Sequence, residues 1–251
     1  MTKLNSRYSD SLAEMATKKG SKHEVNVQTI RIAVLGPSFV GKTQIVNRIV
    51  NNNFFPHYDP TDQQEVYKVF YNRAPPTSPP DHVMIELLDC FPQDHPLLFS
   101  DPVDNEEAKK MQEDLQKVIE NKPEDDKPGS PKWINAFIFV YNSADKGSFT
   151  KLLKIIRSVH DFEESYAKGR SGDGLYVMKY VLGSKKDLKP HKQVLEDREL
   201  EELNTLNSHD KINLQEISAL TAYGIKEVFD NILDEVVGAA DLGGDGDDGN
   251  D

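Results

Sequence analysis

Short apolar runs alternate along this chain with segments in which apolar residues recur every three or four positions. Several runs are continuously apolar, which is typical of strands covered on both faces of a sheet. The spaced pattern is typical of helices that bury one face, and Ile225, Val228, Phe229 and Ile232 follow it near the C-terminus. The predicted strands cover residues 30–35, 65–71, 83–88, 134–141, 175–182 and 211–214, and the predicted helices cover about 43–52, 105–121, 148–168, 193–207 and 223–237.

The order of these elements indicates the fold class. Strands that alternate with helices predict an α/β fold, in which a mostly parallel six-stranded sheet carries helices on both faces. The connection at about 92–132 is long for neighbouring strands, so we expect a helical insertion there rather than an unstructured loop. This insertion is a candidate surface for a partner, and decoration without function is an equal alternative.

Both ends of the chain have the composition of disordered segments. Residues 1–28 are polar with mixed charge and no sustained period, and residues 239–251 consist mainly of aspartate and glycine. We therefore expect a disordered N-terminal extension, one folded domain at 29–238 and an acidic disordered tail.

Charge and composition exclude several classes of function. With 42 acidic and 30 basic residues, the net charge of −12 argues against a nucleic-acid-binding protein and against a polybasic membrane anchor. The sequence has no apolar run of membrane-spanning length and no secretory signal pattern. A single cysteine, Cys90, and the lack of lipidation signals lead us to expect a cytoplasmic protein without a direct lipid anchor.

The segment Gly36–Thr43 matches the pattern G-x-x-x-x-G-K-[ST]. It follows a predicted strand and opens a predicted helix, which is the context that this motif requires. The amide N–H groups of such a loop and the N-terminus of the helix form a cradle for an anion. Lys42 would then reach the outer phosphates, and Thr43 would bind Mg²⁺. A glycine-rich turn with an incidental lysine is the alternative.

Four further segments, at residues 58–61, 89–93, 183–188 and 215–219, follow this loop in a recognisable order. In order and position they resemble the motifs of the small GTPases of the Ras superfamily. The resemblance covers roughly residues 30–238, and it is specific as a set rather than motif by motif. It implies a P-loop NTPase G domain that binds GTP or GDP together with Mg²⁺.

On the base side, the resemblance implies that Asp187 accepts hydrogen bonds from guanine, that Lys185 lies along the base, and that Ala219 donates its backbone N–H. Phe54 has the position that packs edgewise on the base, although Phe55 is an alternative and either ring fits a core role. A turn aspartate is the alternative for Asp187. The implied nucleotide-binding residues are Gly36, Ser38, Phe39, Val40, Gly41, Lys42, Thr43, Gln44, Phe54, Tyr58, Thr61, Ser184, Lys185, Asp187, Leu188, Ser218, Ala219 and Leu220.

On the phosphate side, the resemblance implies three ligands of Mg²⁺, namely Thr43, Thr61 and Asp89, the last of these through water. Tyr58 would cover the phosphates, and Gln93 is the implied catalytic residue because it has the position of the glutamine that orients the attacking water. Residues 58–61 also fit a simple turn, since Asp-Pro is common in turns.

Three departures from the family pattern predict altered chemistry. Ser184 replaces an asparagine, so we expect weaker tethering between loops and lower nucleotide affinity. Pro92 replaces a glycine whose N–H would donate to the terminal phosphate, and this loss is expected to cost about 1.5–3 kcal/mol. Phe39 places a bulky ring beside the phosphates. Together these residues predict retained nucleotide binding with very slow hydrolysis.

The expected function is that of a guanine-nucleotide-dependent switch, with slow or impaired GTP hydrolysis, that recruits protein effectors. Effectors and regulators would bind through the switch loops and the insertion. A pseudo-GTPase that acts as a structural or interaction module in a protein assembly is the main alternative. A third possibility, an ATP-using kinase or ATPase, would need another explanation for Asp187.

Overall fold

The structure is a computed structural model that describes residues 28–57, 61, 63–73, 81–94, 106–119, 134–168, 177–188, 195, 197–206 and 213–242. The predicted N-terminal extension, Tyr58 and all but the first four residues of the tail lie outside the described residues. The predicted insertion is described only in part, at 92–94 and 106–119.

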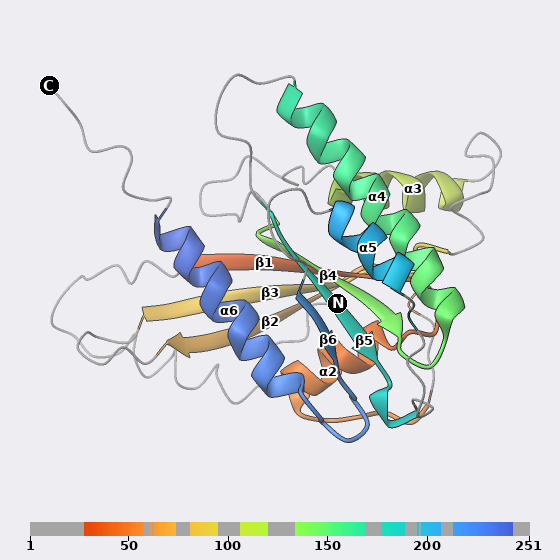
Figure 1. The fold of residues 1–251 in the computed structure, drawn as a ribbon. Helices are drawn as coiled ribbons and strands as arrows, with labels where there is room; N and C mark the ends of the chain where they lie inside the picture. The colour runs from red at the N-terminus through yellow and green to blue at the C-terminus, as the bar shows by residue number, and fades with distance from the viewer. Residues whose placement is uncertain are drawn as a thin grey trace, which may run out of the picture.

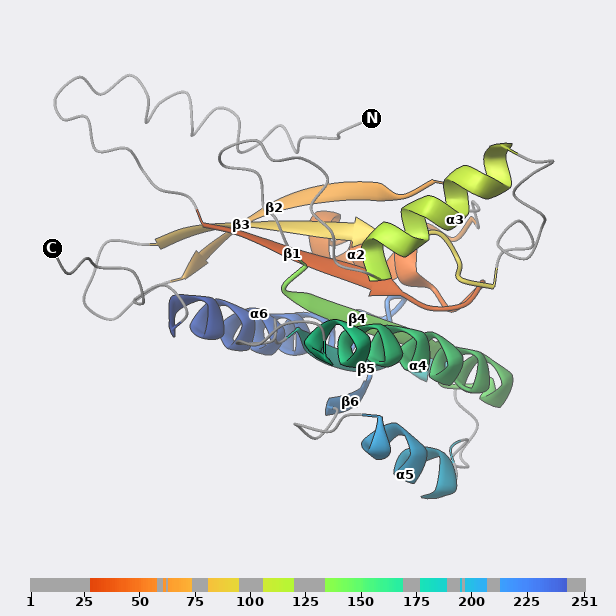
Figure 2. The same cartoon turned by 90° about the horizontal axis from the view of Figure 1, so that it is seen from above.

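A single sheet of six strands forms the centre of the fold (Figure 1). Its order is β2-β3-β1-β4-β5-β6; β2 and β3 are antiparallel, and every other pair is parallel. Figure 2 shows this order from above, with α5 beyond β6. The mostly parallel six-stranded α/β fold is therefore confirmed. The strands are β1 (Gln28–Leu35), β2 (Glu65–Arg73), β3 (Asp81–Asp89), β4 (Ala136–Asn142), β5 (Met178–Ser184) and β6 (Asn213–Glu216).

Each predicted helix is present, and the differences are at the ends. The last helix continues through Gly238 to Leu242, five residues beyond its predicted end and into the predicted tail. Two alanines, Ala239 and Ala240, extend it because alanine has the highest helix propensity. The helices are α2 (Lys42–Asn51), α3 (Glu106–Ile119), α4 (Lys146–Lys168), α5 (Asp197–Thr205) and α6 (Ile225–Leu242), with a 3-10 turn at Lys186–Leu188.

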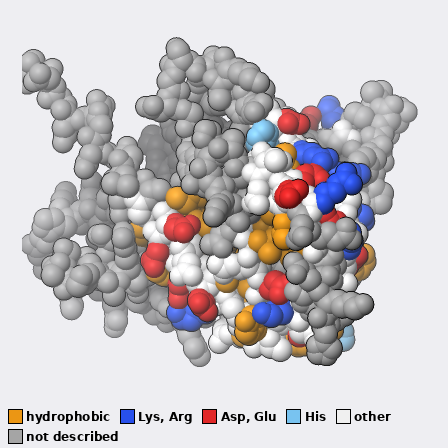
Figure 3. Space-filling model, in the orientation of Figure 1, with side chains coloured by type: hydrophobic (Ala, Val, Ile, Leu, Met, Phe, Trp, Pro, Cys, Tyr) orange, Lys and Arg blue, Asp and Glu red, His pale blue; other side chains and the backbone are white. Residues whose placement is uncertain are grey.

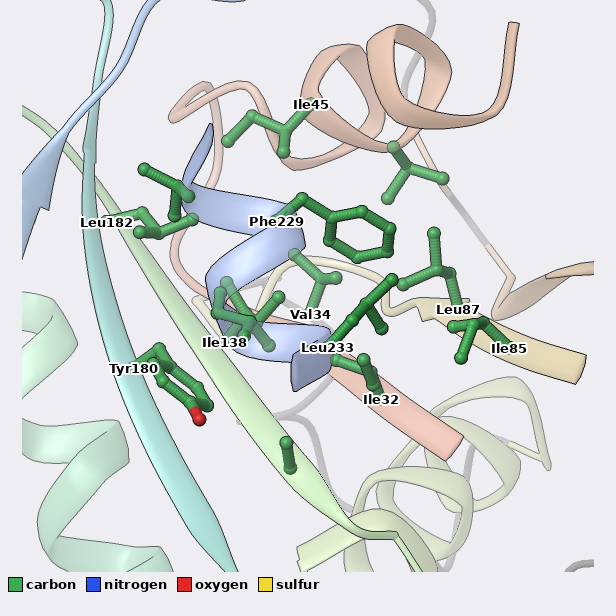
Figure 4. Packing of buried hydrophobic residues seen from close by; sticks show 14 of the residues in the cluster. Ile32, Val34, Ile45, Ile85, Leu87, Ile138, Tyr180, Leu182, Phe229 and Leu233 are labelled. Atoms are coloured by element: carbon green, nitrogen blue, oxygen red, sulfur yellow. The ribbon is translucent and has the colours of Figure 1, made fainter. Parts of the chain in front are cut away.

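Two hydrophobic cores cover the two faces of the sheet. Alternate residues of β1 point to opposite faces, so Ile32 and Val34 enter the first core while Ala33 and Leu35 enter the second. Figure 4 shows the first core, in which Phe229 of α6 lies between the sheet and α2. The continuously apolar runs of the sequence follow from this burial on both faces.

The second core explains the helix of the predicted insertion. Val118 of α3 is buried in this core together with Leu88 of β3 and Phe149 of α4. Because β3 and β4 both run parallel to β1, which lies between them, the chain must cross over one face of the sheet. Helix α3 lies on that crossover, so it belongs to the packed domain.

A ladder of charged side chains crosses three strands on the face of the sheet that the second core covers. Glu86 of β3 is paired in register with Arg31 of β1 and Lys68 of β2. Its carboxylate oxygens lie 3.1 Å from Arg31 Nε and 2.7 Å from Lys68 Nζ. Arg31 and Glu86 are both buried, so each charge depends on the other for its stability.

Replacing Glu86 with glutamine keeps the volume and removes the charge. We expect this variant to lower the free energy of unfolding by about 3 kcal/mol, because it leaves the buried Arg31 guanidinium without its carboxylate. Chemical denaturation measures the change, and Glu227→Gln, on an exposed position of α6, is the control. A loss below about 1 kcal/mol would mean that the ladder is energetically neutral.

Candidate functional site

The candidate site lies at the edge of the sheet where the parallel strands end. Residues 36–41 connect β1 to α2, while Asp89 ends β3 and Ser184 ends β5. In sheets of this type, ligands bind at the carboxyl ends of the strands. The topology therefore brings together the segments that the sequence singled out at 36–43, 89–93 and 183–188.

Glycine and close packing shape the loop between β1 and α2. A Cβ atom on Gly36 would lie 2.3 Å from the carbonyl oxygen of Val140, so only glycine fits there. Gly41 has a φ of 92° at the N-cap of α2, which is a conformation that glycine adopts without strain. Phe39 has a φ of 62° and is 64% exposed, so its ring points away from the core.

The side chain of Lys42 reaches back from the start of α2 to the first residues of this loop. Its Nζ donates hydrogen bonds to the carbonyl oxygens of Gly36 at 2.8 Å and Pro37 at 3.0 Å. Burial lowers the pKa of Lys42 to about 8, although Asp89 and Asp94 act in the opposite direction. The lysine is therefore a buried ammonium group held in the loop by main-chain oxygens.

Asp89 is a buried carboxylate at the end of β3. It is 0% exposed, and among the described residues neither of its oxygens makes a hydrogen bond of normal geometry. Burial raises the pKa of Asp89 to about 6, while nearby Thr43 and Lys42 oppose the shift. An acceptor that is buried and unsatisfied is costly, so this position favours a cation ligand.

The two predicted threonine ligands lie together. Thr43 Oγ1 and Thr61 Oγ1 are 2.9 Å apart. Mg²⁺ prefers oxygen ligands and usually takes only one or two carboxylates from the protein. Within the described ranges, no group of three His, Cys, Asp or Glu side chains that could hold a metal is present. Asp89 and two hydroxyl groups are thus the donor set that fits Mg²⁺ here.

Gln93 contacts the loop between β1 and α2 (residues 36–41, below called the phosphate loop) instead of pointing into solvent. Its Oε1 accepts the N–H of Gly36 at 2.5 Å, and its Nε2 donates to the carbonyl oxygen of Phe91 at 2.5 Å. Its own N–H points to the oxygen of Gly36 at 3.5 Å. In this arrangement both ends of the carboxamide are bonded to the main chain, so the side chain is not available to orient a water molecule.

Asp94 is a site residue that the sequence analysis did not single out. Its Oδ1 accepts hydrogen bonds from the N–H of Ser38 at 2.5 Å and the Ser38 hydroxyl at 2.7 Å, and its Oδ2 lies 2.8 Å from Lys151 Nζ. Burial acts to raise the pKa of Asp94, but the bonds from Lys151 and Ser38 outweigh it and hold the pKa below its usual value. The aspartate therefore carries a negative charge against the loop.

The segment that follows β5 is bonded to the phosphate loop. The Ser184 hydroxyl lies against the carbonyl oxygens of Val40 and, at 2.9 Å, of Tyr141. Since a hydroxyl has one proton, it can donate to only one of these at a time, and the weaker tethering expected from the sequence stays a prediction. Lys185 Nζ donates to the oxygen of Phe39 at 2.5 Å, so two successive residues contact the loop.

The 215–219 segment completes the base side. Ser218 Oγ donates to Asp187 Oδ1 at 2.5 Å, and the N–H of Lys186 donates to the oxygen of Ile217 at 3.1 Å. Arg48 of α2 also binds this segment, because its Nε donates to the oxygen of Ala219 at 2.8 Å. Arg48 matches no motif in the sequence, so the sequence analysis did not select it.

The remaining predicted residues differ in how far their side chains are exposed to solvent. Phe54 is partly buried against the first core, whereas Phe55 is exposed and its N–H donates to Gln44 Oε1 at 3.0 Å. Leu188 and Leu220 are exposed near the two base-side segments. Tyr58 lies outside the described residues, so its predicted cover over the phosphates stays a prediction.

A glycine-bounded loop before a helix, at the carboxyl edge of a mostly parallel sheet, defines a nucleotide-binding protein of the P-loop class. Comparison with known proteins narrows this class. A sequence model of the Ras family matches residues 128–238. This match covers less than half of the chain, and together with two relatives it supports similarity to the small GTPases of the Ras superfamily, as a divergent member.

Two relatives come from Dictyostelium discoideum. The Ras-related protein rapC is 36% identical over 63 residues, which make up 25% of this chain and 21% of rapC. The Ras-like protein rasX is 23% identical over 213 residues, which make up 83% of this chain and 76% of rasX. The chain therefore aligns with about a fifth of rapC and with most of rasX, at low identity.

Replacing Asp89 with asparagine tests the buried carboxylate. The pKa of Asp89 is about 6 in the folded protein, and its ordinary value is 3.8. Between about pH 4 and pH 6 the protein therefore takes up a proton on folding, and above pH 6 the ionised carboxylate lowers the free energy of unfolding. We expect the free energy of unfolding of Asp89→Asn at pH 7.5 without nucleotide to exceed that of wild type by on the order of 1–3 kcal/mol, and the variant therefore to unfold at a higher temperature.

The size of this effect depends on pH. The difference should fall as the pH is lowered through 6 and vanish below about pH 4, because both proteins are then neutral at this position. Asp161→Asn, at an exposed position of α4, is the control for the loss of a carboxylate. A lower unfolding temperature for Asp89→Asn at pH 7.5 would contradict the assignment.

Proposed function

We propose that the chain is a guanine-nucleotide-dependent switch with slow or impaired GTP hydrolysis that recruits protein effectors. One observation carries the proposal: the segment at 183–188, on the base side of the site, is bonded directly to the phosphate loop. Ser184 contacts Val40 and Lys185 contacts Phe39. A single nucleotide would therefore meet both elements at once, with its phosphates at one and its base at the other.

The base-side contacts support a preference for guanine. Asp187 is bonded to Ser218 through one oxygen, and its carboxylate retains acceptor capacity for the two N–H donors on the edge of guanine. Lys185 spans the distance from this segment to the loop, so its aliphatic stem is positioned beside the space for a base. Ala219 would add its backbone N–H.

The phosphate-side contacts support Mg²⁺ as the companion of the nucleotide. Lys42 would exchange its bonds with loop carbonyls for phosphate oxygens, while Thr43, Thr61 and Asp89 would hold the cation. When bound, Mg²⁺ would neutralise charge on the outer phosphates. The buried and unsatisfied oxygens of Asp89 are the feature that supports it most directly.

The segment after β3 supports slow hydrolysis. Gln93 is held by Gly36 and Phe91, and it would have to break both bonds before it could orient water. Pro92 has no N–H with which to sense the terminal phosphate. A pseudo-GTPase that acts as an interaction module is a second candidate, which the bonds between Asp94 and Ser38 favour because they fill part of the loop.

Effectors and regulators are the proposed partners, and the switch segment around Thr61 and helix α3 are their proposed contact surfaces. Figure 3 shows acidic and basic side chains interspersed on one face of the protein, which agrees with a protein partner better than with a nucleic acid. Of the helices in the described part of the chain, none has the length and apolar character to span a membrane. A cytoplasmic location stays an expectation from the sequence.

Nucleotide binding to the purified full chain tests the proposal. With Mg²⁺ present, we expect GTP and GDP to bind and ATP to bind at least about 100-fold more weakly, because a carboxylate selects the guanine edge. Asp187→Ala should remove this preference, while Asp230→Ala on α6 should not. Equal binding of ATP and GTP, or no binding of any of the three, would contradict the proposed function.

Hydrolysis tests the role of Gln93. We expect a single-turnover GTP hydrolysis rate below about 10⁻⁴ s⁻¹ for the wild type. Gln93→Ala should lower the free energy of unfolding by about 1–3 kcal/mol, since two buried hydrogen bonds are lost, yet leave the hydrolysis rate unchanged within experimental error. Asn231→Ala, an exposed position on α6, controls for loss of a carboxamide. A large fall in rate for Gln93→Ala would instead support Gln93 as a catalytic residue.

A further inference from the structure

The phosphate loop already has an anion bound to one of its amides. The carboxylate of Asp94 accepts both the N–H and the hydroxyl of Ser38, at 2.5 and 2.7 Å. These are the polar groups that such a loop offers to phosphate. The occupant comes from the chain itself, 56 residues away in sequence.

The position of Ser38 identifies the phosphate that Asp94 would displace. The N-terminus of α2, at Lys42, is the end of the loop that binds the inner phosphates, and the lysine side chain reaches toward the outer ones. Lys42 Nζ is bonded to Gly36 and Pro37, directly before Ser38. The Ser38 side of the loop is thus where the terminal phosphate of a triphosphate would lie.

We propose that Asp94 is a specificity-determining residue that competes with the terminal phosphate and favours GDP over GTP. This inference rests on the proposed guanine-nucleotide site. A carboxylate and a phosphate are both acceptors and both negative, so they cannot share the donors of Ser38. A triphosphate must move Asp94 away, whereas a diphosphate that leaves Ser38 free does not.

Lys151 holds the competing group in place from another element. Its Nζ lies 2.8 Å from Asp94 Oδ2, while Oδ1 faces Ser38. Lys151 is on α4, whose neighbouring residues Leu152 and Leu153 are buried in the second core. The anchor is therefore fixed by core packing, and only the long lysine side chain is exposed to solvent and to salt.

Two substitutions separate the charge from the contact. Asp94→Asn keeps the size of the side chain and removes the negative charge, and Asp94→Ala removes the contact as well. We expect each to tighten GTP binding by roughly tenfold or more, because the triphosphate no longer displaces a charge-assisted hydrogen bond. The affinity for GDP should change by less than about twofold.

Lys151→Ala provides a third variant outside the loop. Without its anchor, Asp94 should leave Ser38 more readily, so GTP binding should tighten by an amount smaller than in Asp94→Ala. Raising the salt concentration should tighten GTP relative to GDP in the wild type and have little effect on this ratio in Lys151→Ala. Asp161→Asn, an exposed position on α4 ten residues beyond Lys151, is the control for net charge.

The measurement is the ratio of the dissociation constants for GDP and GTP, obtained by titrating the full chain in Mg²⁺, with thermal unfolding to verify that each variant is folded. An unchanged ratio in both Asp94 variants, or weaker GTP binding by them, would overturn the inference about Asp94. In that case, GDP binding by the wild type would still leave the proposed function standing. GTP binding gained by the Asp94 variants would support it even if wild type bound none. If wild type and the variants all failed to bind either nucleotide, both proposals would be wrong.

Discussion

The contact between Gly36 and β4 is the constraint on which the site depends. Because a side chain at Gly36 would collide with the carbonyl oxygen of Val140, the start of the loop lies directly on the neighbouring strand. This approach places the loop over the ends of the parallel strands. It also puts the Gly36 N–H and oxygen within reach of Gln93 and Lys42 respectively. The close backbone packing therefore determines both the shape of the loop and which side chains bind it.

The two halves of the site differ in how complete they are. On the base side, Ser184, Lys185 and Arg48 connect three chain segments through hydrogen bonds, so the arrangement is held before any ligand arrives. On the phosphate side, Asp89 is buried without hydrogen-bond partners of normal geometry among the described residues, while Asp94 fills an amide of the loop. A buried acceptor without a partner, as at Asp89, is costly; a bound cation would satisfy Asp89, and a bound phosphate would displace Asp94 from Ser38. Binding at the base side should therefore need little rearrangement, and binding at the phosphate side should need more.

The sequence predicted the sheet and the motif residues because their signals are local. Continuous apolar runs marked the strands, and the spacing of Gly36, Gly41 and Lys42 marked the loop before a helix. The contacts of Asp94 and Arg48 are different in kind, since they join residues 56 and 171 positions apart. Nothing in the local pattern indicates such pairs, which depend on how the connections cross the sheet. Gln93 combines the two cases: its position matched a family motif, but its hydrogen bonds depend on the backbone after Asp89.

The proline at position 92 connects these observations. Proline fixes φ near −65° and has no N–H, so the backbone between Asp89 and Asp94 cannot adopt every conformation that a glycine there would allow. Pro92 is itself buried, and the residues on either side of it, Phe91 and Gln93, are bonded to each other through the Gln93 carboxamide. This stiff segment carries Asp94 to Ser38 and to the anchor on α4. The loss of glycine thus has two linked effects, because the segment that no longer offers an N–H to a phosphate now offers a carboxylate to the loop.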